Sequence, residues 1–301
     1  MIELDAVSKR HGAALAVDAL SLTVPAGAIT VLLGPSGCGK STTLRMINRL
    51  IAPSSGTIRL EGRDTAQIDP IALRRSIGYV IQDAGLFPHW SVAKNIAAVP
   101  TLLGWDKTRI DSRVAELLRL VDLDADQFAG KRPNLLSGGQ AQRVGVARAL
   151  AADPKLLLMD EPFGALDPIT RRDLQAALRR IQRETGKTIV LVTHDIEEAV
   201  LLGNHIAVLR AGRLVQHGTP LELLEHPADA FVRDFFGGAA LGLRRLSLLP
   251  AAARARPGEA PGEPLRPDAS LRDALEAMLA RGCDRVAIGG AGVVAISDLL
   301  S

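Results

Sequence analysis

A glycine-rich segment at residues 34–42 contains the residue types that bind phosphate. It reads Gly34-Pro35-Ser36-Gly37-Cys38-Gly39-Lys40-Ser41-Thr42 and fits the pattern G-x-x-x-x-G-K-S/T. The apolar run Ile29–Leu33 precedes it and helical spacing follows it, so backbone N–H groups and a helix N-terminus converge on phosphate oxygens. Lys40 is then placed to reach the β- and γ-phosphates, and Ser41 to offer a hydroxyl to Mg²⁺. The segment predicts a nucleotide phosphate site, and a glycine-rich turn that merely tolerates a lysine is the alternative.

Two acidic residues follow a later apolar run. Leu156–Met159 leads directly into Asp160 and Glu161. A phosphate loop requires a carboxylate on a neighbouring strand to hold the metal, which makes Asp160 the expected partner of Mg²⁺. Glu161 lies one residue past the strand end, where it can polarise a water aimed at the γ-phosphate, so hydrolysis is chemically available. An acid pair that only caps the next helix is the alternative.

A second glycine-rich turn and two isolated polar residues are ambiguous when taken alone. Leu136-Ser137-Gly138-Gly139-Gln140 precedes a helical stretch and can bind phosphate through backbone dipoles, but it is equally well a helix cap. His194 ends an apolar strand, a position common for a hydrogen-bonded core histidine. Gln82 is compatible with an ordinary strand-end amide.

The composition limits the classes of protein to consider. The 301 residues are 47% hydrophobic and 23% charged, which indicates a globular chain of two domains, or of one large domain with an appendage. A net charge of +3 and only 3% aromatic residues argue against a nucleic-acid surface. Cys38 and Cys283 belong to no CxxC or Cys/His cluster, which argues against disulfides and zinc and favours a reducing cytosol. We expect no membrane span and no export signal.

Strand and helix patterns alternate along the chain. Residues 88–130 are mainly helical in pattern and are interpreted as a helical insertion between strands. The flanking pattern is typical of a parallel α/β sheet. The expected helices cover 42–51, 141–152 and 174–183, and the expected strands are Ile2–Val7, Leu20–Val24, Ile29–Leu33, Thr57–Leu60, Leu156–Met159 and Thr188–Val192.

The ordered motifs of the chain resemble those of the ATP-binding subunits of ABC transporters. The resemblance covers residue 1 to about residue 237 and rests on six elements in the family's order: GPSGCGKST, Gln82 in VIQD, LSGGQ, LLLMDEP, Ala165-Leu166-Asp167, and His194 in LVTHD. It implies an α/β P-loop NTPase of the ABC type, with a parallel-sheet core, an antiparallel β subdomain and an inserted helical subdomain. Six ordered elements are far more specific than a phosphate loop alone.

The resemblance also implies a mechanism, in which two copies form a head-to-tail dimer around ATP and Mg²⁺. Lys40, Gln82, Glu161 and His194 are the expected catalytic residues, and Ser41, Gln82 and Asp160 the expected magnesium ligands. LSGGQ of one copy is expected to close on ATP held by the other. The expected nucleotide contacts outside the phosphate loop are His11, Ser137, Gly138, Gly139, Gln140 and Asp167.

Two positions depart from the family pattern. His11 stands where the family usually presents an aromatic ring to adenine; an imidazole still stacks on a base, though less extensively than tyrosine. Gly164 stands where a serine usually precedes Ala165-Leu166-Asp167. Neither change touches Lys40, Asp160 or Glu161, so an active ATPase is expected.

Two further stretches resemble the osmoprotectant branch of the family, which imports glycine betaine, choline, carnitine or proline betaine. They are residues 163–171 and 218–237. The branch implies two integral-membrane permease subunits, an extracytoplasmic binding protein and a peripheral position at the cytoplasmic face. An aromatic patch containing Phe87 and Trp90 is expected to receive a permease helix, with local core packing as the alternative. The competing functions are an importer ATPase for another small solute and a soluble ABC ATPase acting on nucleic acid.

Composition changes after residue 237. Residues 238–269 are interpreted as a linker, because they carry prolines, paired arginines and alanine-rich stretches. Residues 270–301 resemble a single, partial CBS motif, with a capped helix from Ser270 to Gly282 and strands Arg285–Ile288 and Val293–Ile296. A paired motif forms a sensor, so a single copy is either completed by another subunit or vestigial. The arginines between 244 and 256 suit anionic lipid or a solvated linker.

Overall fold

The computed structural model describes residues 1–237 and 241–299. These residues form two compact units, which are described separately. The first comprises Met1–Asp195 and Leu202–His217, and the second comprises Ile196–Leu201 and Gly218–Ser301. The second unit therefore includes residues 218–237, which the sequence motifs group with the ATP-binding domain.

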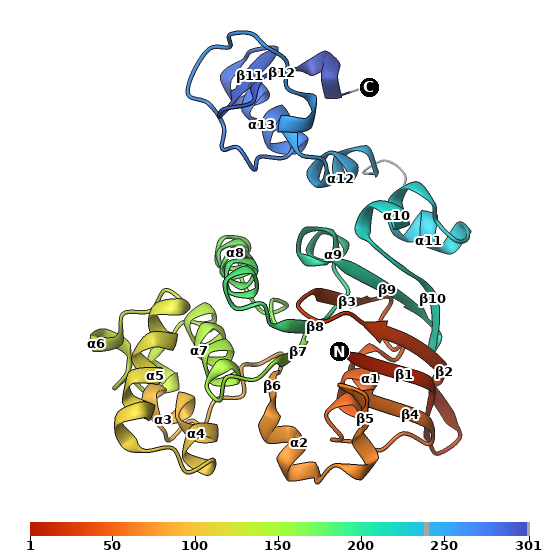
Figure 1. The fold of residues 1–301 in the computed structure, drawn as a ribbon, viewed down its shortest axis with the longest axis vertical. Helices are drawn as coiled ribbons and strands as arrows, with labels where there is room; N and C mark the ends of the chain where they lie inside the picture. The colour runs from red at the N-terminus through yellow and green to blue at the C-terminus, as the bar shows by residue number, and fades with distance from the viewer. Residues whose placement is uncertain (238–240, 300–301) are drawn as a thin grey trace. The chain divides into compact units, whose positions relative to one another are not determined.

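A six-stranded sheet forms the centre of the first unit (Figure 1). Strands β6, β7, β8, β3 and β9 run parallel in that spatial order, and β10 borders β9. Every residue of β3, β7 and β8 is buried, because a parallel sheet is covered on both faces. The strands are β3 (Ile29–Leu33), β6 (Ile77–Val80), β7 (Leu156–Asp160), β8 (Thr188–Thr193), β9 (His205–Arg210) and β10 (Arg213–Gly218).

A four-stranded sheet packs beside the parallel sheet and shares its core. β2 (Ala14–Val24), β1 (Ile2–His11), β4 (Ser55–Leu60) and β5 (Arg63–Asp64) pair in this order, and neighbouring strands run antiparallel. One hydrophobic cluster joins side chains of both sheets and of α1 (Lys40–Ile47); it includes Leu20, Leu44 and Leu158. The expected parallel core and antiparallel β subdomain are confirmed.

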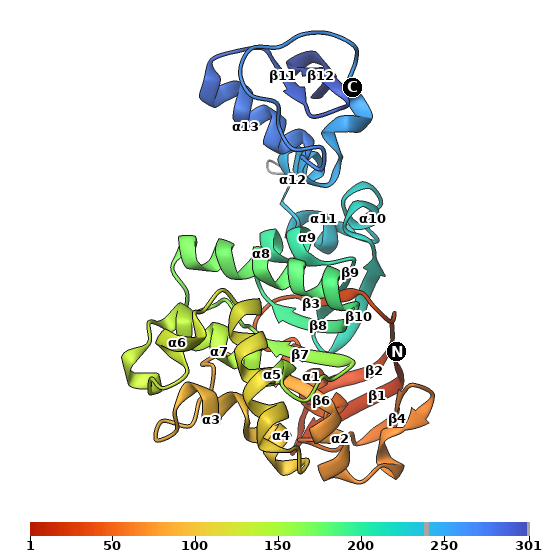
Figure 2. The same cartoon turned by 60° about the vertical axis from the view of Figure 1, so that its left-hand side comes forward.

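The helical insertion comes between two strands in chain order, as the sequence predicts. It follows β6 and precedes β7 (Figure 2). It contains α3 (Val92–Ile96), α4 (Ala98–Leu102), α5 (Lys107–Leu120), α6 (Ala125–Phe128) and α7 (Gly138–Leu150). The 18-residue helix α8 (Pro168–Thr185) follows β7, and the short α2 (Pro70–Ser76) precedes β6. Four strands of the first unit, β5, β6, β9 and β10, and helix α2 were not anticipated from the sequence.

The second unit has a small core of its own. It contains residues 196–201 of α9 (Ile196–Leu202), then α10 (Pro220–Glu225), α11 (Ala230–Phe235), α12 (Leu241–Leu248), α13 (Leu271–Arg281) and the antiparallel pair β11 (Arg285–Ile288) and β12 (Gly292–Ala295). Ser270 and Asp273 form the predicted capping box at the start of α13, and Gly282 ends that helix in the left-handed conformation. The expected helix and two strands are confirmed, with the second strand beginning one residue earlier.

The segment interpreted as a linker is partly structured. It contains α12 and a 3₁₀ turn at Ala251–Arg254, and Ala251 is buried in the same cluster as Leu271 and Met278 of α13. The alanines that led to the linker interpretation have side chains small enough to pack closely against α13. Residues 238–240 of the expected linker and 300–301 of the expected CBS-like motif lie outside the described residues.

Within the part of the chain that the structure describes, no helix combines the length and the apolar character needed to span a bilayer.

The core shared by the two sheets predicts a large loss of stability when one of its side chains is truncated. Replacing Leu158, a fully buried residue of this core, with alanine should lower the free energy of unfolding of the first unit by about 2–5 kcal/mol, through lost burial and the cavity left behind. Trp90 and Trp105 both lie in the first unit, so tryptophan fluorescence during urea denaturation measures its unfolding. Leu102→Ala, at a position that is 62% exposed, is the control and should change stability by less than about 0.5 kcal/mol. An L158A curve that overlays the control would contradict this account of the core.

Candidate functional site

The phosphate loop connects the end of β3 to the start of α1. Gly34 and Gly39 have φ angles of 153° and 100°, a region that side chains rarely allow. A Cβ atom at Gly34 would meet the carbonyl oxygen of Leu209, and one at Gly39 would meet that of Ala16. The loop therefore needs glycine at both positions, and its backbone turns tightly into the N-terminus of α1, where N–H groups are available to phosphate.

Lys40 is buried and its side chain folds back over the loop. Its Nζ donates to the carbonyl oxygens of Gly34 at 2.7 Å and Pro35 at 3.0 Å, and this ammonium is a compact positive charge suited to phosphate oxygens. The Sγ of Cys38 lies 3.9 Å from Nζ. Burial raises the pKa of this thiol, and the charge of Lys40 opposes the rise only in part.

Ser41 and Asp160 meet beside the loop, as predicted for a magnesium site. The Ser41 hydroxyl donates to Oδ1 of Asp160 at 2.7 Å, and the Arg45 guanidinium lies 3.8 Å from Oδ2. A hydroxyl and a carboxylate are the hard oxygen donors that Mg²⁺ prefers, so these residues fit that ion. Tyr79 of β6 lies nearby; burial, and then the Asp160 charge, raise the pKa of its phenol, which keeps it protonated.

Glu161 and His194 form a pair at the same edge of the sheet. Oε2 of Glu161 lies 3.1 Å from Nδ1 of His194. A Cβ atom added at Gly164 would lie 3.8 Å from both Oε2 of Glu161 and Nε2 of Gln82, so both side chains lie beside Gly164. These three side chains follow β7, β8 and β6, whose parallel course brings their carboxyl ends to one edge. The arrangement offers a carboxylate to accept a proton and an imidazole to orient it.

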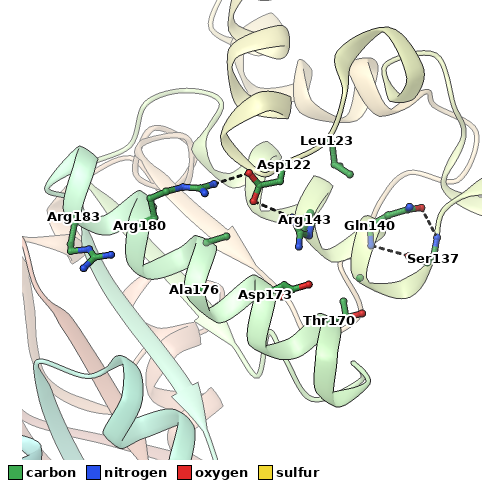
Figure 3. Close-up of a pocket in the computed structure, with 12 residues that line it drawn as sticks. Asp122, Leu123, Ser137, Gln140, Arg143, Thr170, Asp173, Ala176, Arg180 and Arg183 are labelled. Atoms are coloured by element: carbon green, nitrogen blue, oxygen red, sulfur yellow. Dashed lines mark hydrogen bonds and ion pairs between the residues drawn. The ribbon is translucent and has the colours of Figure 1, made fainter. Parts of the chain in front are cut away.

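The LSGGQ segment begins α7 at a separate cavity (Figure 3). The Ser137 hydroxyl accepts from the backbone N–H of Gln140 at 3.3 Å, and the Gln140 side chain accepts from the N–H of Ser137 at 3.0 Å. The cavity measures about 730 Å³, and no phosphate-loop residue lines it. One chain therefore brings together Lys40, Ser41, Asp160 and the Glu161 pair, but it does not add Ser137 or Gly139 to them.

Three arginines and two acids also line this cavity. They are Arg143, Arg180, Arg183, Asp122 and Asp173. The Asp122 carboxylate forms ion pairs with the guanidinium of Arg143 of α7 at 3.3 Å and with that of Arg180 of α8 at 2.9 Å (Figure 3). Because Asp122 lies two residues after the end of α5 (Lys107–Leu120), these ion pairs link α7 and α8 to that end of the helix.

Two other predicted nucleotide contacts lie at exposed turns. Asp167 caps α8, accepting from the N–H groups of Ile169 and Thr170 at 3.1 Å each. Hydrogen bonds, first from the Thr170 side chain and then from its N–H, hold the pKa of Asp167 below its ordinary value. His11 ends β1 and pairs with Ala14 of β2. The Ala16 carbonyl of that hairpin lies against Gly39, so the hairpin borders the phosphate loop.

Sequence reasoning did not identify Arg45 or Asp122. Arg45 follows Ser41 by four residues on one helix, and this spacing places both side chains on one face. That signal was available in the sequence. Asp122 has a positive φ of 57° after the end of α5. Its two arginine partners lie 21 and 58 residues away, so no local sequence pattern indicates them.

Comparison with known proteins agrees with the fold and the motif order. A family model described as "ABC transporter" matches residues 17–164. The "Glycine betaine uptake system ATP-binding protein YehX" of Escherichia coli is 54% identical over 285 residues, 94% of this chain and 92% of that protein.

Two further relatives match over the ATP-binding part. The "Osmoprotectant import ATP-binding protein OsmV" of Salmonella typhimurium is 56% identical over 77% of this chain and 60% of that protein. The "Glycine betaine/carnitine/choline transport ATP-binding protein OpuCA" of Bacillus subtilis is 52% identical over 79% of this chain and 62% of that protein. The chain thus spans about three fifths of the length of these two relatives.

Solved structures of ATP-binding cassettes resemble the chain as well. A dimeric cassette in a post-hydrolysis state, bound to ADP and Pi, has a TM-score of 0.66 and 34% identity, covering 73% of this chain and 99% of that chain. The cbiO1 protein of Clostridium perfringens, part of an ABC transporter complex, has a TM-score of 0.69 and 29% identity, covering 75% of this chain and 91% of that chain.

The environment of Cys38 predicts slow reaction with alkylating agents. Its thiol is buried and its pKa is raised, so both access and the thiolate fraction are low at neutral pH. We expect iodoacetamide to modify native Cys38 much more slowly than the partly exposed Cys283, and both cysteines at similar rates in urea. Mass spectrometry of timed samples measures this. Equal native rates at the two positions would contradict the buried environment of Cys38.

Proposed function

The chain belongs to the ABC transporter family, and from that premise we propose that it hydrolyses ATP to power an importer of quaternary-amine osmoprotectants. The observation that carries the proposal is the similarity to the E. coli glycine betaine uptake protein over 94% of this chain and 92% of the relative. Glycine betaine, choline, carnitine and proline betaine are the proposed solute class. The OsmV and OpuCA names point to the same class of solute.

We propose that the phosphate loop and its neighbours hold Mg-ATP. Backbone N–H groups of residues 34–42 and the Lys40 ammonium bind the phosphates. Ser41, Asp160 and Gln82 are the residues that would hold Mg²⁺, and the short contact between the Ser41 hydroxyl and the Asp160 carboxylate supports this role. When bound, the metal neutralises charge that develops on the phosphates. His11 borders the loop on the β1–β2 hairpin and is the proposed contact of adenine.

Glu161 is the proposed general base for hydrolysis. Its carboxylate accepts a proton from the water that attacks the γ-phosphate, and His194 fixes the orientation of that carboxylate. The 3.1 Å contact between the two side chains supports these roles. Gln82 follows β6, and its amide lies on the same side of Gly164 as the Glu161 carboxylate. We propose that this amide interacts with the metal only while the γ-phosphate is present.

A second copy of the chain is proposed to complete each site. Ser137, Gly138, Gly139 and Gln140 of one copy would contact ATP held by the phosphate loop of the other, with Asp167 near the same seam. The dimeric state of the ADP-bound cassette and the separation of Ser137 from the phosphate loop within one chain support this assembly. A helix N-terminus that begins with Ser and Gly suits an incoming phosphate.

Two integral-membrane permease subunits are the proposed working partners, at the cytoplasmic face of the membrane. A binding protein on the other side would deliver the solute, and nucleic acid is not a proposed partner. Phe87 and Trp90 are 49% and 41% exposed and their rings lie 4.5 Å apart. An exposed aromatic pair is suited to anchor a partner helix, so we place the permease contact there. The CBS-like part is a proposed regulatory appendage.

Glu161→Gln should separate nucleotide binding from hydrolysis. The amide keeps the size of the side chain but cannot accept the proton, so we expect turnover to fall by about 10²–10⁴-fold while ATP still binds. Steady-state phosphate release and size-exclusion chromatography with Mg-ATP measure the two effects, and a stable dimer is expected. Wild-type turnover in E161Q would refute Glu161 as the base, and a monomer under these conditions would refute the shared site.

The solute class is tested with the chain assembled with its permeases and binding protein in proteoliposomes. We expect ATP turnover to rise with glycine betaine, choline, carnitine or proline betaine in the presence of the binding protein, and not with sulfate or spermidine. If only sulfate or only spermidine stimulates ATP turnover, the proposed solute class is wrong. No stimulation by any solute, with assembly intact, would remove the import function.

A further inference from the structure

The loop between β6 and α3 carries a catalytic residue at one end and the exposed aromatics at the other. We define residues 81–90 as the coupling loop. Gln82 lies near its start, and Phe87 and Trp90 lie near its end. Ala84 and Gly85 between them both have positive φ angles, 54° and 55°, so the loop turns sharply at its middle. A turn of this kind needs external contacts to hold it, because an alanine with positive φ is strained.

Arg148 of α7 supplies those contacts. Its two terminal nitrogens donate to the carbonyl oxygens of Gly85 and Ala84, each at 2.7 Å. A planar guanidinium can grip two consecutive carbonyls at once, which a lysine cannot do. Arg148 is half-buried against the loop, and this burial lowers the pKa of its guanidinium.

The same helix makes further contacts with the coupling loop. The amide of Gln142 donates to the carbonyl of Ile81 at 3.4 Å, on the other side of Gln82. A Cβ atom at Gly145 would contact Ala84 at 3.4 Å, so the helix and the loop approach closely between these two side chains. α7 therefore contacts the loop both before and after Gln82.

The aromatic end of the loop is held by Arg148 and by Asn95. The guanidinium carbon lies 6.0 Å from the centre of the Phe87 ring. The buried Asn95 accepts from the N–H of Phe87 at 2.8 Å and donates to the carbonyls of Phe87, Trp90 and Ser91 at 3.1–3.4 Å. The exposed rings are thus presented on a fixed backbone.

α7 joins this loop to the LSGGQ segment as one rigid element. Ser137 caps its N-terminus, and Arg148 lies eleven residues further on, near its end. At 1.5 Å per residue the two are about 16 Å apart along one uninterrupted helix. A displacement of the Ser137 end is carried to the Arg148 end, because an intact helix does not compress.

We propose that Arg148 is the positioning residue that couples LSGGQ movement to the permease contact. The inference rests on the proposed function: when Ser137 engages ATP, α7 moves as a unit and Arg148 carries the coupling loop, with Phe87 and Trp90, along with it. Without the guanidinium the helix still moves, but the only α7 contacts that the loop keeps are those with Gln142 and Gly145, so the aromatic pair follows the helix incompletely. Arg148 touches neither nucleotide nor metal in this role.

Arg148→Met tests the proposal in the full transporter. We expect the assembled transporter to lose about tenfold in solute-stimulated turnover, relative to the basal ATP turnover of the same variant, and about tenfold in solute uptake per ATP, the size of a typical coupling energy. Amide hydrogen exchange of residues 81–90 should accelerate in the isolated R148M chain, with its thermal midpoint unchanged. R148K should retain part of the coupling, because one ammonium can still donate to one carbonyl.

Arg119→Met is the matched control. It removes the same charge from the same helical insertion, at an exposed residue whose guanidinium donates to Ala115 one turn earlier in its own helix, so R119M should couple like wild type. R148M that couples like R119M would overturn the inference. If R148M does not fold, R148K decides: wild-type coupling and wild-type exchange of residues 81–90 would overturn it. A wild-type transporter that no solute stimulates would instead overturn the proposed function.

Discussion

The hydrogen bond between Ser41 and Asp160 joins two residues 119 positions apart in sequence, and the site depends on it. It fixes the start of α1 against the end of β7, which places the phosphate loop beside the residues that follow the other parallel strands. Parallel strands make this possible, because their carboxyl ends lie at one edge and each delivers a side chain there. Gln82, Glu161 and His194 follow three adjacent strands, β6, β7 and β8, and reach the same neighbourhood for that reason.

The same constraint explains why a single chain holds only half of the proposed site. The edge of the sheet can present residues that follow strands, but Ser137 begins a helix of the insertion and lines a different cavity. The insertion is tied to α8 through Asp122, which receives one arginine from α7 and one from α8. A segment on a separate subdomain can approach and leave the nucleotide while the phosphate loop, Ser41 and Asp160 stay fixed, which is what a cycle of binding and hydrolysis requires.

Sequence patterns predicted the buried strands β3, β7 and β8 and the alternating strand β1, but they missed β6 and also β9, whose four central residues are buried. β3, β7 and β8 appear as continuous apolar runs because helices or the second sheet cover them. β6 is only four residues long and contains Gly78, where a Cβ atom would meet the backbone of Ala149. This glycine allows α7 to pack close to the strand, but in the sequence a glycine weakens the prediction of a strand. The motif residues were found because their types are fixed by chemistry. Arg148 and Asp122 were not, because their partners are backbone carbonyls or residues distant in sequence.

The two departures from the family pattern fall where the fold does not depend on the missing group. Nothing lies closer than 3.7 Å to a Cβ atom added at Gly164, and its φ is not positive, so packing would accept a serine and glycine is not required by the backbone. His194 contacts the Glu161 carboxylate at 3.1 Å without any group from position 164. His11 lies on an exposed turn of β1 and β2, where an imidazole and a phenol ring are equally compatible with the strands. Neither departure therefore alters the strands that position Lys40, Asp160 and Glu161.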